Sequence, residues 1–167
     1  IRNSLSLKYP KTALQILVIT DGSSDKTRSI ANAFTAVKTL HLDRREGKAA
    51  AMNRAMLHVT TPIVVFSDAN TNLDPETLVH LVQPFSDASV AAVAGEKRIS
   101  ALYSQNTASA NEGLYWKYES VLKKLDASLY SVVGAAGELF AIRTSCYTLI
   151  EKDTILDDFM LSMRVAE

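Results

Sequence analysis

The most informative part of the sequence is Ile63–Thr71, which reads IVVFSDANT. A polar cluster directly follows four apolar, mostly β-branched or aromatic residues, which is typical of a strand buried on both faces of a parallel sheet. Ligands bind beyond the carboxyl ends of such strands, where Asp68 and Asn70 lie. If the chain stays extended there, both side chains point the same way, and their oxygens suit a divalent cation that holds a phosphate. The alternative is a strand-to-helix turn in which Asp68 caps local amides.

The size and composition of the chain exclude several classes of protein. Its 167 residues suffice for one domain, and 47% hydrophobic and 22% charged residues are ordinary for a globular fold. The 18 basic and 18 acidic residues cancel, so no overall field attracts nucleic acid. A single cysteine, Cys146, excludes an internal disulfide framework. No apolar run approaches the length that crosses a bilayer. Because the chain starts at Ile1 rather than Met, we expect it to be part of a longer protein.

Strand and helix signals alternate through the first half of the sequence. Apolar runs bounded by turn residues predict strands at 14–19, 39–42, 63–66 and 90–94. Between them, helical spacing and capping residues predict helices after Asp25, from Lys48, and after Asp74-Pro75-Glu76. This order is typical of an α/β fold with a mostly parallel sheet and helices on both faces.

The pattern changes in the second half. We expect a loop at 100–111, a long helix to about Leu129, a strand at 138–142 and a short helix that ends near Ile150. A last helix is expected to begin at Asp157 and Asp158, because carboxylates stabilise the positive end of a helix.

Acidic residues follow the predicted strands in a way that favours one shared site. Three clusters stand at comparable places: Asp21 with Asp25, Asp68 with Asn70, and Asp157 with Asp158. The first two follow parallel strands and should therefore meet at one edge of the sheet. Each cluster alone is also a common capping arrangement.

A lysine and two glycines are further candidates for the same edge. Lys48 could bring a positive charge to a diphosphate, or it is a solvated lysine in the first turn of a helix. Gly134 and Gly137 either permit a close backbone approach to a ligand or make a tight turn.

Five segments resemble, in order, the motifs of family 2 glycosyltransferases. Residues 18–27 (VITDGSSDKT) resemble the family's nucleotide-binding strand and turn, and 47–55 (GKAAAMNRA) its Gly-Lys-Ala helix start. Residues 67–70 (SDAN) stand in place of its Asp-X-Asp metal motif, 134–143 resemble its Gly-X-X-Gly strand, and 157–159 (DDF) its acidic catalytic-base motif. The matches span nearly the whole chain, and their order makes the set specific.

The resemblance implies a GT-A fold and a hexosyltransferase-type activity. The reaction would be an inverting transfer from a nucleotide-diphosphate sugar, a UDP-sugar, to a hydroxyl of a carbohydrate or lipid-linked acceptor, in polysaccharide or glycoconjugate synthesis. Residues 1–98 would form a nucleotide-binding half and 99–167 an acceptor and catalytic-base half. Because membrane-spanning helices flank many relatives, the chain would be the cytoplasmic domain of a membrane-associated protein.

The resemblance also assigns roles to individual residues. Asp158 would be the general base that takes the proton of the acceptor hydroxyl. Asp21 would contact the uracil or ribose, and Asp68 the ribose and a Mg²⁺ or Mn²⁺ ion that it shares with Asn70. The remaining members of the implied donor site are Lys48, Gly134 and Gly137.

The chain departs from the family pattern in ways that matter for function. Asn70 stands where the family has a second aspartate, which lowers the Coulomb attraction for a cation. The family's first strand, which lies centrally in that fold, has no counterpart before Ile1, so we expect a gap in the middle of the sheet.

Two alternatives remain open from the sequence. A flavodoxin-like receiver module also places an aspartate after a buried strand, as Asp68 is placed here, but it does not need the pair Asp157 and Asp158. The other alternative is a glycosyltransferase fragment that keeps the fold and lacks activity.

Overall fold

The computed structural model of the chain describes residues 1–96, 120–123, 137–152 and 157–166, together with positions 118, 125 and 154. Its strands are β1 (Leu17–Asp21), β2 (Lys38–Leu42), β3 (Ile63–Ser67), β4 (Ala92–Ala94) and β5 (Leu139–Arg143). Its α-helices are α1 (Arg2–Leu5), α2 (Thr27–Asn32), α3 (Lys48–Met56), α4 (Thr77–Val82) and α6 (Asp157–Ala166). Short 3₁₀ turns occupy Lys11–Ala13, Gln83–Ser86 and Thr144–Cys146.

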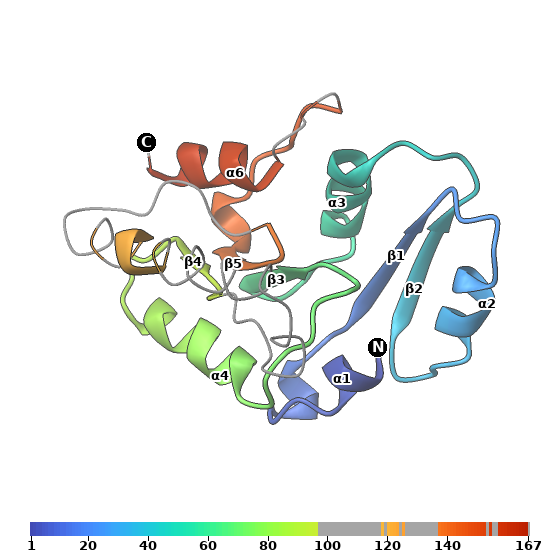
Figure 1. Cartoon of the computed structure of the whole chain (residues 1–167), viewed down its shortest axis with the longest axis horizontal. Coiled ribbons are helices and arrows are strands. Elements are labelled where there is room, and N and C mark those ends of the chain that lie inside the picture. The colour runs from blue at the N-terminus through green and yellow to red at the C-terminus, as the bar shows by residue number, and fades with distance from the viewer. Residues whose placement is uncertain are drawn as a thin grey trace, which may run out of the picture.

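The predicted strands are confirmed to within a few residues, and so are the starts of α3 and α6 (Figure 1). The 3₁₀ turn at Thr144–Cys146 stands where a short helix was expected. Positions 118, 120–123 and 125 are helical, in agreement with the long helix predicted there. The expected loop at 100–111, Gly134 and the boundary between the two proposed halves lie outside the described residues.

The strand pairing differs from the prediction of a mostly parallel sheet. β1 and β2 form a parallel pair, with Leu17 opposite Lys38. In the other sheet β5 lies between β3 and β4 and is antiparallel to both, with Ile63 opposite Arg143. The run Leu139–Ile142 of β5 is continuously apolar, which suits a strand with both faces covered. Phe140, Ala141 and Ile142 are at most 3% exposed.

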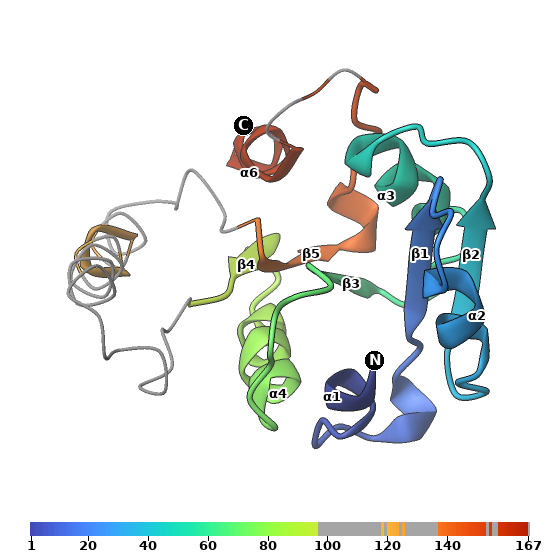
Figure 2. The same ribbon diagram turned by 45° about the vertical axis from the view of Figure 1, so that its right-hand side comes forward.

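Helices cover both faces of the β3–β5–β4 sheet, as predicted (Figure 2). Successive side chains of a strand point to opposite faces, so neighbouring residues of β5 join different clusters. Phe140 and Ile142 pack with residues of α3 and α6, whereas Ala141 packs with Leu81 of α4 and with Phe85. Burial of these apolar side chains is the main force that holds the layers together.

The sheet is discontinuous between β1 and β3. Among the described residues β1 pairs only with β2, and β3 pairs only with β5. A gap in the middle of the sheet was expected, because no segment of this sequence matches the family's central first strand. Helix α3 bridges the two parts, since it packs on β1 and also places Ala49 and Met52 in the core with β5.

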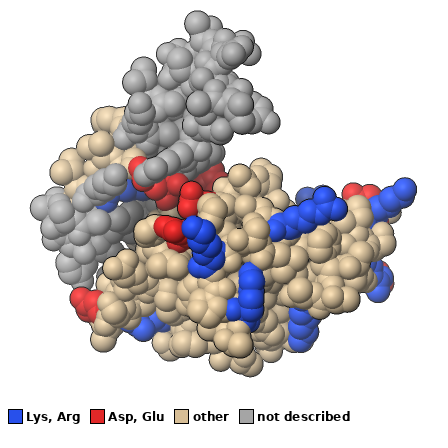
Figure 3. Space-filling model, turned by 90° about the horizontal axis from the view of Figure 1, so that it is seen from below, with Lys and Arg blue, Asp and Glu red and all other residues tan. Residues whose placement is uncertain are grey.

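The surface of the described part shows no concentration of basic charge on the face drawn in Figure 3. Lys and Arg side chains are scattered singly there across a largely uncharged surface. No described helix is long and apolar enough to cross a membrane.

Candidate active site

Four residues from distant parts of the chain meet beyond the carboxyl end of β3. The Lys48 ammonium at the start of α3 lies 3.3 Å from Oδ1 of Asp68 and 3.5 Å from the carbonyl oxygen of Gly137. The carboxylate of Asp158 lies against Gly137, because a Cβ atom built on that glycine would be 2.6 Å from Asp158 Oδ2. The structure therefore brings together Lys48, Asp68, Gly137 and Asp158, which the sequence placed in one site.

Backbone hydrogen bonds between β3 and β5 hold Asp68 in place. The Asp68 N–H donates to the carbonyl of Glu138 over 3.1 Å, and the Thr71 hydroxyl donates to the same carbonyl over 3.2 Å. These bonds continue the β3–β5 ladder by one step, so they set the position of Asp68 relative to Gly137.

Asn53 of α3 connects this helix to residues 147–150, in the segment before α6. Its side-chain amide donates to the Ile150 carbonyl over 2.7 Å, and its oxygen accepts the Ile150 N–H over 3.0 Å and the Tyr147 hydroxyl over 2.9 Å. Arg164 of α6 in turn donates to both carboxylate oxygens of Glu151, over 2.8 and 2.7 Å. These contacts dock α6, and with it Asp158, against α3.

The chain is not extended after β3, which corrects one expectation about Asp68 and Asn70. The strand ends at Ser67, and a turn follows that is closed by a bond from the Thr71 N–H to the Asp68 carbonyl. An extended chain would have pointed the side chains of Asp68 and Asn70 the same way, but the chain turns here instead. Asn70 lies exposed on this turn. The strand signal was correct, but the strand and its two-residue alternation end at Ser67, one residue before Asp68.

Asp21 lies at the same edge but faces the protein. Its Oδ2 accepts the N–H groups of Glu46 and Gly47, each over 2.8 Å, and its Oδ1 accepts a bond from Arg54 over 3.2 Å. Burial disfavours the charged form, but the two backbone hydrogen bonds and the bond and charge of Arg54 outweigh it. The pKa of Asp21 therefore lies below its ordinary value.

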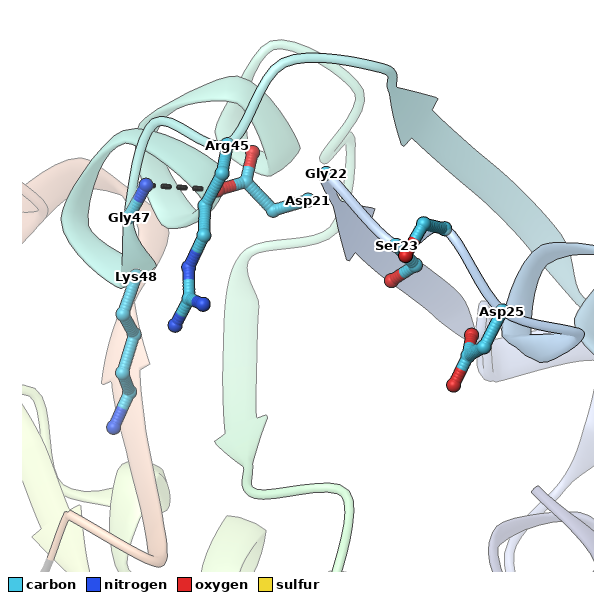
Figure 4. A pocket seen from close by; sticks show the side chains of 8 residues that line it. Asp21, Gly22, Ser23, Asp25, Arg45, Gly47 and Lys48 are labelled. Atoms are coloured by element: carbon cyan, nitrogen blue, oxygen red, sulfur yellow. Dashed lines mark hydrogen bonds between the residues drawn. The ribbon is translucent and has the colours of Figure 1, made fainter.

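A pocket of about 450 Å³ opens beside this carboxylate, a volume in the range of small-ligand sites. Figure 4 shows the side chains of Arg45 and Lys48 on one side of it and those of Ser23 and Asp25 on the other. Asp25 Oδ1 also accepts the N–H of Thr27, the first residue of α2, over 2.9 Å, an Asx-type turn that leads into the helix. The full lining is Asp21, Gly22, Ser23, Ser24, Asp25, Arg45, Gly47 and Lys48.

Sequence reasoning missed Arg45 and Arg54 as parts of the site. Arg54 follows Gly47 by seven residues, which puts both on one face of α3 two turns apart. Considering the polar as well as the apolar positions of α3 would have indicated Arg54. Gly134 lies outside the described residues, as does the side chain of Asp157 at the start of α6.

The donor set suits a cation bound jointly with a nucleotide. Among the described residues no group of three or more His, Cys, Asp and Glu side chains could hold a metal ion. Mg²⁺ in phosphate-transfer sites is commonly held by one or two carboxylates together with substrate phosphates. Asp68, 38% exposed and beside the Lys48 ammonium, fits that mode.

Comparison with known proteins identifies the family. The model of the family "Glycosyl transferase family 2" matches residues 1–145. Beta-monoglucosyldiacylglycerol synthase of Trichormus variabilis is 29% identical over 98% of this chain and 37% of its own length. Poly-beta-1,6-N-acetyl-D-glucosamine synthase of Staphylococcus epidermidis is 33% identical over 57% of this chain and 24% of its own. The chain thus spans less than half the length of these relatives.

Solved structures show the same fold. The Pyrobaculum calidifontis mannosyltransferase PcManGT, in complex with GDP-Man and Mn²⁺, superposes with a TM-score of 0.78 at 23% identity, over 98% of this chain and 46% of that one. Residues 1–349 of S. aureus TarS with UDP-GlcNAc superpose with a TM-score of 0.63 at 16% identity, over 99% of this chain and 48% of that one. The family model matches most of the chain, and the fold is of the GT-A type. The chain therefore belongs to glycosyl transferase family 2.

Proposed function

We propose that this chain carries the donor site and the catalytic base of an inverting glycosyltransferase that moves a sugar from a UDP-sugar to an acceptor hydroxyl. The observation that carries the proposal is the convergence of the Lys48 ammonium, the Asp68 carboxylate and the Asp158 carboxylate around Gly137. A cation and two acids at one edge of a sheet are the groups that sugar transfer from a diphosphate requires.

The diphosphate of the donor is proposed to lie at the start of α3. The N-terminal end of a helix carries a partial positive charge and free N–H groups that favour phosphate. Lys48 adds a full charge at that end, and the adjoining pocket has room for part of a nucleotide. Together they stabilise the negative charge that grows on the leaving diphosphate.

Asp68 and Asn70 are proposed to hold a Mg²⁺ or Mn²⁺ ion together with the donor phosphates. Such an ion neutralises charge on the leaving group. Asn70 would reach the ion from the exposed turn rather than from the strand. PcManGT, the structural neighbour, was solved with Mn²⁺ and a nucleotide sugar, which supports this assignment.

Asp158 is proposed to be the general base. It would take the proton of the acceptor hydroxyl while the acceptor oxygen forms a bond to the anomeric carbon and the bond from that carbon to the diphosphate breaks. Its place at the start of α6, against Gly137, puts it within the same site as Lys48 and Asp68. Attack from the side opposite the leaving group inverts the anomeric configuration.

The acceptor is proposed to be a carbohydrate or a lipid-linked hydroxyl, in polysaccharide or glycoconjugate synthesis. The names of the two relatives support this class, since one makes a glycolipid and the other a polysaccharide. We also propose that the chain is the cytoplasmic catalytic domain of a membrane-associated protein, a location that is compatible with either kind of acceptor. Membership of the family argues against a receiver-type module.

Transfer from a panel of nucleotide sugars, with Mn²⁺ or Mg²⁺, tests the proposal in the full-length protein that contains this chain. We expect UDP-sugars to be used, and Asp68→Asn to lose most transfer. Asp87→Asn is the matched control, because the Asp87 side chain accepts hydrogen bonds from the N–H and hydroxyl groups of Ser89 and lies outside the site. Transfer from no nucleotide sugar would contradict the proposed function, and equal loss in both variants would contradict the assigned site.

A further inference from the structure

We infer that Asn53 and Arg164 are positioning residues for the proposed base. Through the segment 147–151 they dock α6, which carries Asp158, on α3, which carries Lys48. This inference rests on the proposed function, because it takes Asp158 as the base and Lys48 as the contact to the diphosphate. It goes beyond that function by assigning part of the transfer rate to two residues outside the site that the sequence predicts.

Lys48 and Asp158 belong to different helices, so their relative position depends on how these helices are docked. Lys48 is the first residue of α3, and Asp158 lies in the first turn of α6. Both helices lie on the same side of β5 (Figure 2). A general base acts only within hydrogen-bond reach of the proton that it takes. A shift of α6 by about 1 Å would therefore slow the transfer.

Asn53 holds the segment 147–151 on α3. Its amide nitrogen donates to the Ile150 carbonyl over 2.7 Å, and its oxygen accepts the Ile150 N–H over 3.0 Å and the Tyr147 hydroxyl over 2.9 Å. Residues 147–150 belong to no helix or strand, so their backbone polar groups need partners elsewhere. An amide carries a donor and an acceptor side by side, and one side chain therefore fixes both backbone groups of Ile150 to α3.

Arg164 holds the same segment on α6. Its Nη2 donates to both carboxylate oxygens of Glu151, over 2.8 and 2.7 Å, and its Nη1 donates to the Leu149 carbonyl over 2.9 Å. The planar guanidinium presents its N–H groups in fixed directions, so these bonds set the orientation of the segment as well as its distance. Arg164 lies in the last turn of α6, and its bonds thus restrain the helix that carries Asp158.

Apolar packing turns the Asp158 side of α6 toward the same segment. Ile150 is 3% exposed and Leu161 is 1% exposed, and both belong to one cluster with Met52 of α3. Leu161 follows Asp158 by three residues, nearly one helical turn, so the two side chains share a face of α6. The rotation of α6 that directs Asp158 toward the site therefore depends on the place of Ile150.

The two residues differ in what their removal does to stability. The side chains of Arg164 and Glu151 are 26% and 60% exposed, and exposed ion pairs contribute little to the free energy of unfolding. Arg164 variants should therefore fold. Loss of the Asn53 amide would leave polar groups of the buried Ile150 unpaired, which lowers stability. Arg164 is for this reason the main subject of the test.

The test measures transfer and calorimetric titration of UDP, both with Mn²⁺, in the full-length protein that contains this chain. For Arg164→Met we expect kcat to fall by about 10- to 100-fold, the scale of a misplaced group, while the affinity and stoichiometry of UDP binding stay unchanged. Arg164→Lys should recover part of kcat because it keeps the charge. Lys8→Met is the matched control: Lys8 forms an exposed ion pair with Glu76 outside the site, and its loss should leave kcat unchanged.

A double-mutant cycle with Asp158→Asn shows whether Arg164 acts through the base. If it does, Arg164→Met should slow transfer no further once the carboxylate is removed. An undiminished effect in that background would overturn the inference. So would a loss of UDP affinity in Arg164→Met, or a loss of UDP stoichiometry in proportion to kcat, which would show a purely structural role.

Asn53→Asp is the second variant. It keeps an acceptor for the Ile150 N–H and the Tyr147 hydroxyl but removes the donor to the Ile150 carbonyl, so we expect a lower kcat with unchanged UDP affinity. If this variant does not fold, the Arg164 variants carry the test. A kcat equal to that of the unaltered protein in Arg164→Met would overturn this inference and leave the proposed function standing. Absence of transfer by the unaltered protein would instead contradict the proposed function.

Discussion

The carboxylate of Asp158 lies against the Cα atom of Gly137, so closely that a methyl group on Gly137 would come within 2.6 Å of Asp158 Oδ2. The two residues are more than twenty positions apart, and α6 and the start of β5 bring them together. The contact explains why this turn has a glycine: a larger residue would push the proposed base away from the site.

Gly137→Ala should therefore impair the chemical step. The methyl group would displace the Asp158 carboxylate, and a misplacement of about 1 Å can cost on the order of 10²-fold in rate. We expect kcat to fall by about 10- to 100-fold while UDP affinity, measured by calorimetry, stays the same. Unchanged kcat would show that Asp158 does not act from this position.

Asp158→Asn should abolish most transfer and spare donor binding. Removal of a general base typically costs about 10²–10⁴-fold in rate, because the base acts in the transition state and not in ground-state binding. Asp157→Asn is the matched comparison at the neighbouring position and should have a smaller effect. Full turnover of Asp158→Asn, or loss of UDP binding alone, would contradict the proposed mechanism.

The metal site should be weak without nucleotide. Asp68 supplies one charge and Asn70 none, so donor phosphates are needed to complete the ligand shell. Calorimetry should show Mn²⁺ binding that strengthens when UDP is present, and Asn70→Asp should raise Mn²⁺ affinity. Tight Mn²⁺ binding to the nucleotide-free protein would count against this, as would UDP binding that does not depend on metal.

Stability should depend on the charge of Asp21. Its pKa lies below the ordinary value of 3.8, so the folded state favours the carboxylate. That contribution is fully present above the unfolded pKa and is lost as the pH falls through the folded pKa. The urea midpoint of Asp21→Asn should be lower than that of the unaltered chain at neutral pH.

The difference between the two urea midpoints should shrink as the pH falls below about 4, where the carboxylate is lost in the unaltered chain as well. Asp43→Asn is the control, because its side chain is 92% exposed, and it should change the midpoint little. A difference for Asp21→Asn that is constant from neutral to acid pH would show that the carboxylate charge is not the cause.

Local signals in the sequence determined the helices and strands, and the sequence also predicted much of the proposed site. Apolar runs such as Ile63–Phe66 and the capping sequence at Asp74 place strands and helix starts to within a few residues, because both depend on interactions between near neighbours in the chain. The ordered family motifs also predicted Lys48, Asp68, Gly137 and Asp158 as members of one site, and these residues lie close together in the structure.

Only the tertiary structure decided which groups these residues contact. β5 lies antiparallel between β3 and β4, and no local signal states the partner or direction of a strand. Asp21 faces Glu46, Gly47 and Arg54, although a carboxylate after a strand is equally suited to a ligand. The physical reason is the same in both cases: strand pairing and the partner of a carboxylate depend on which distant segments approach, and packing of the whole chain determines that approach.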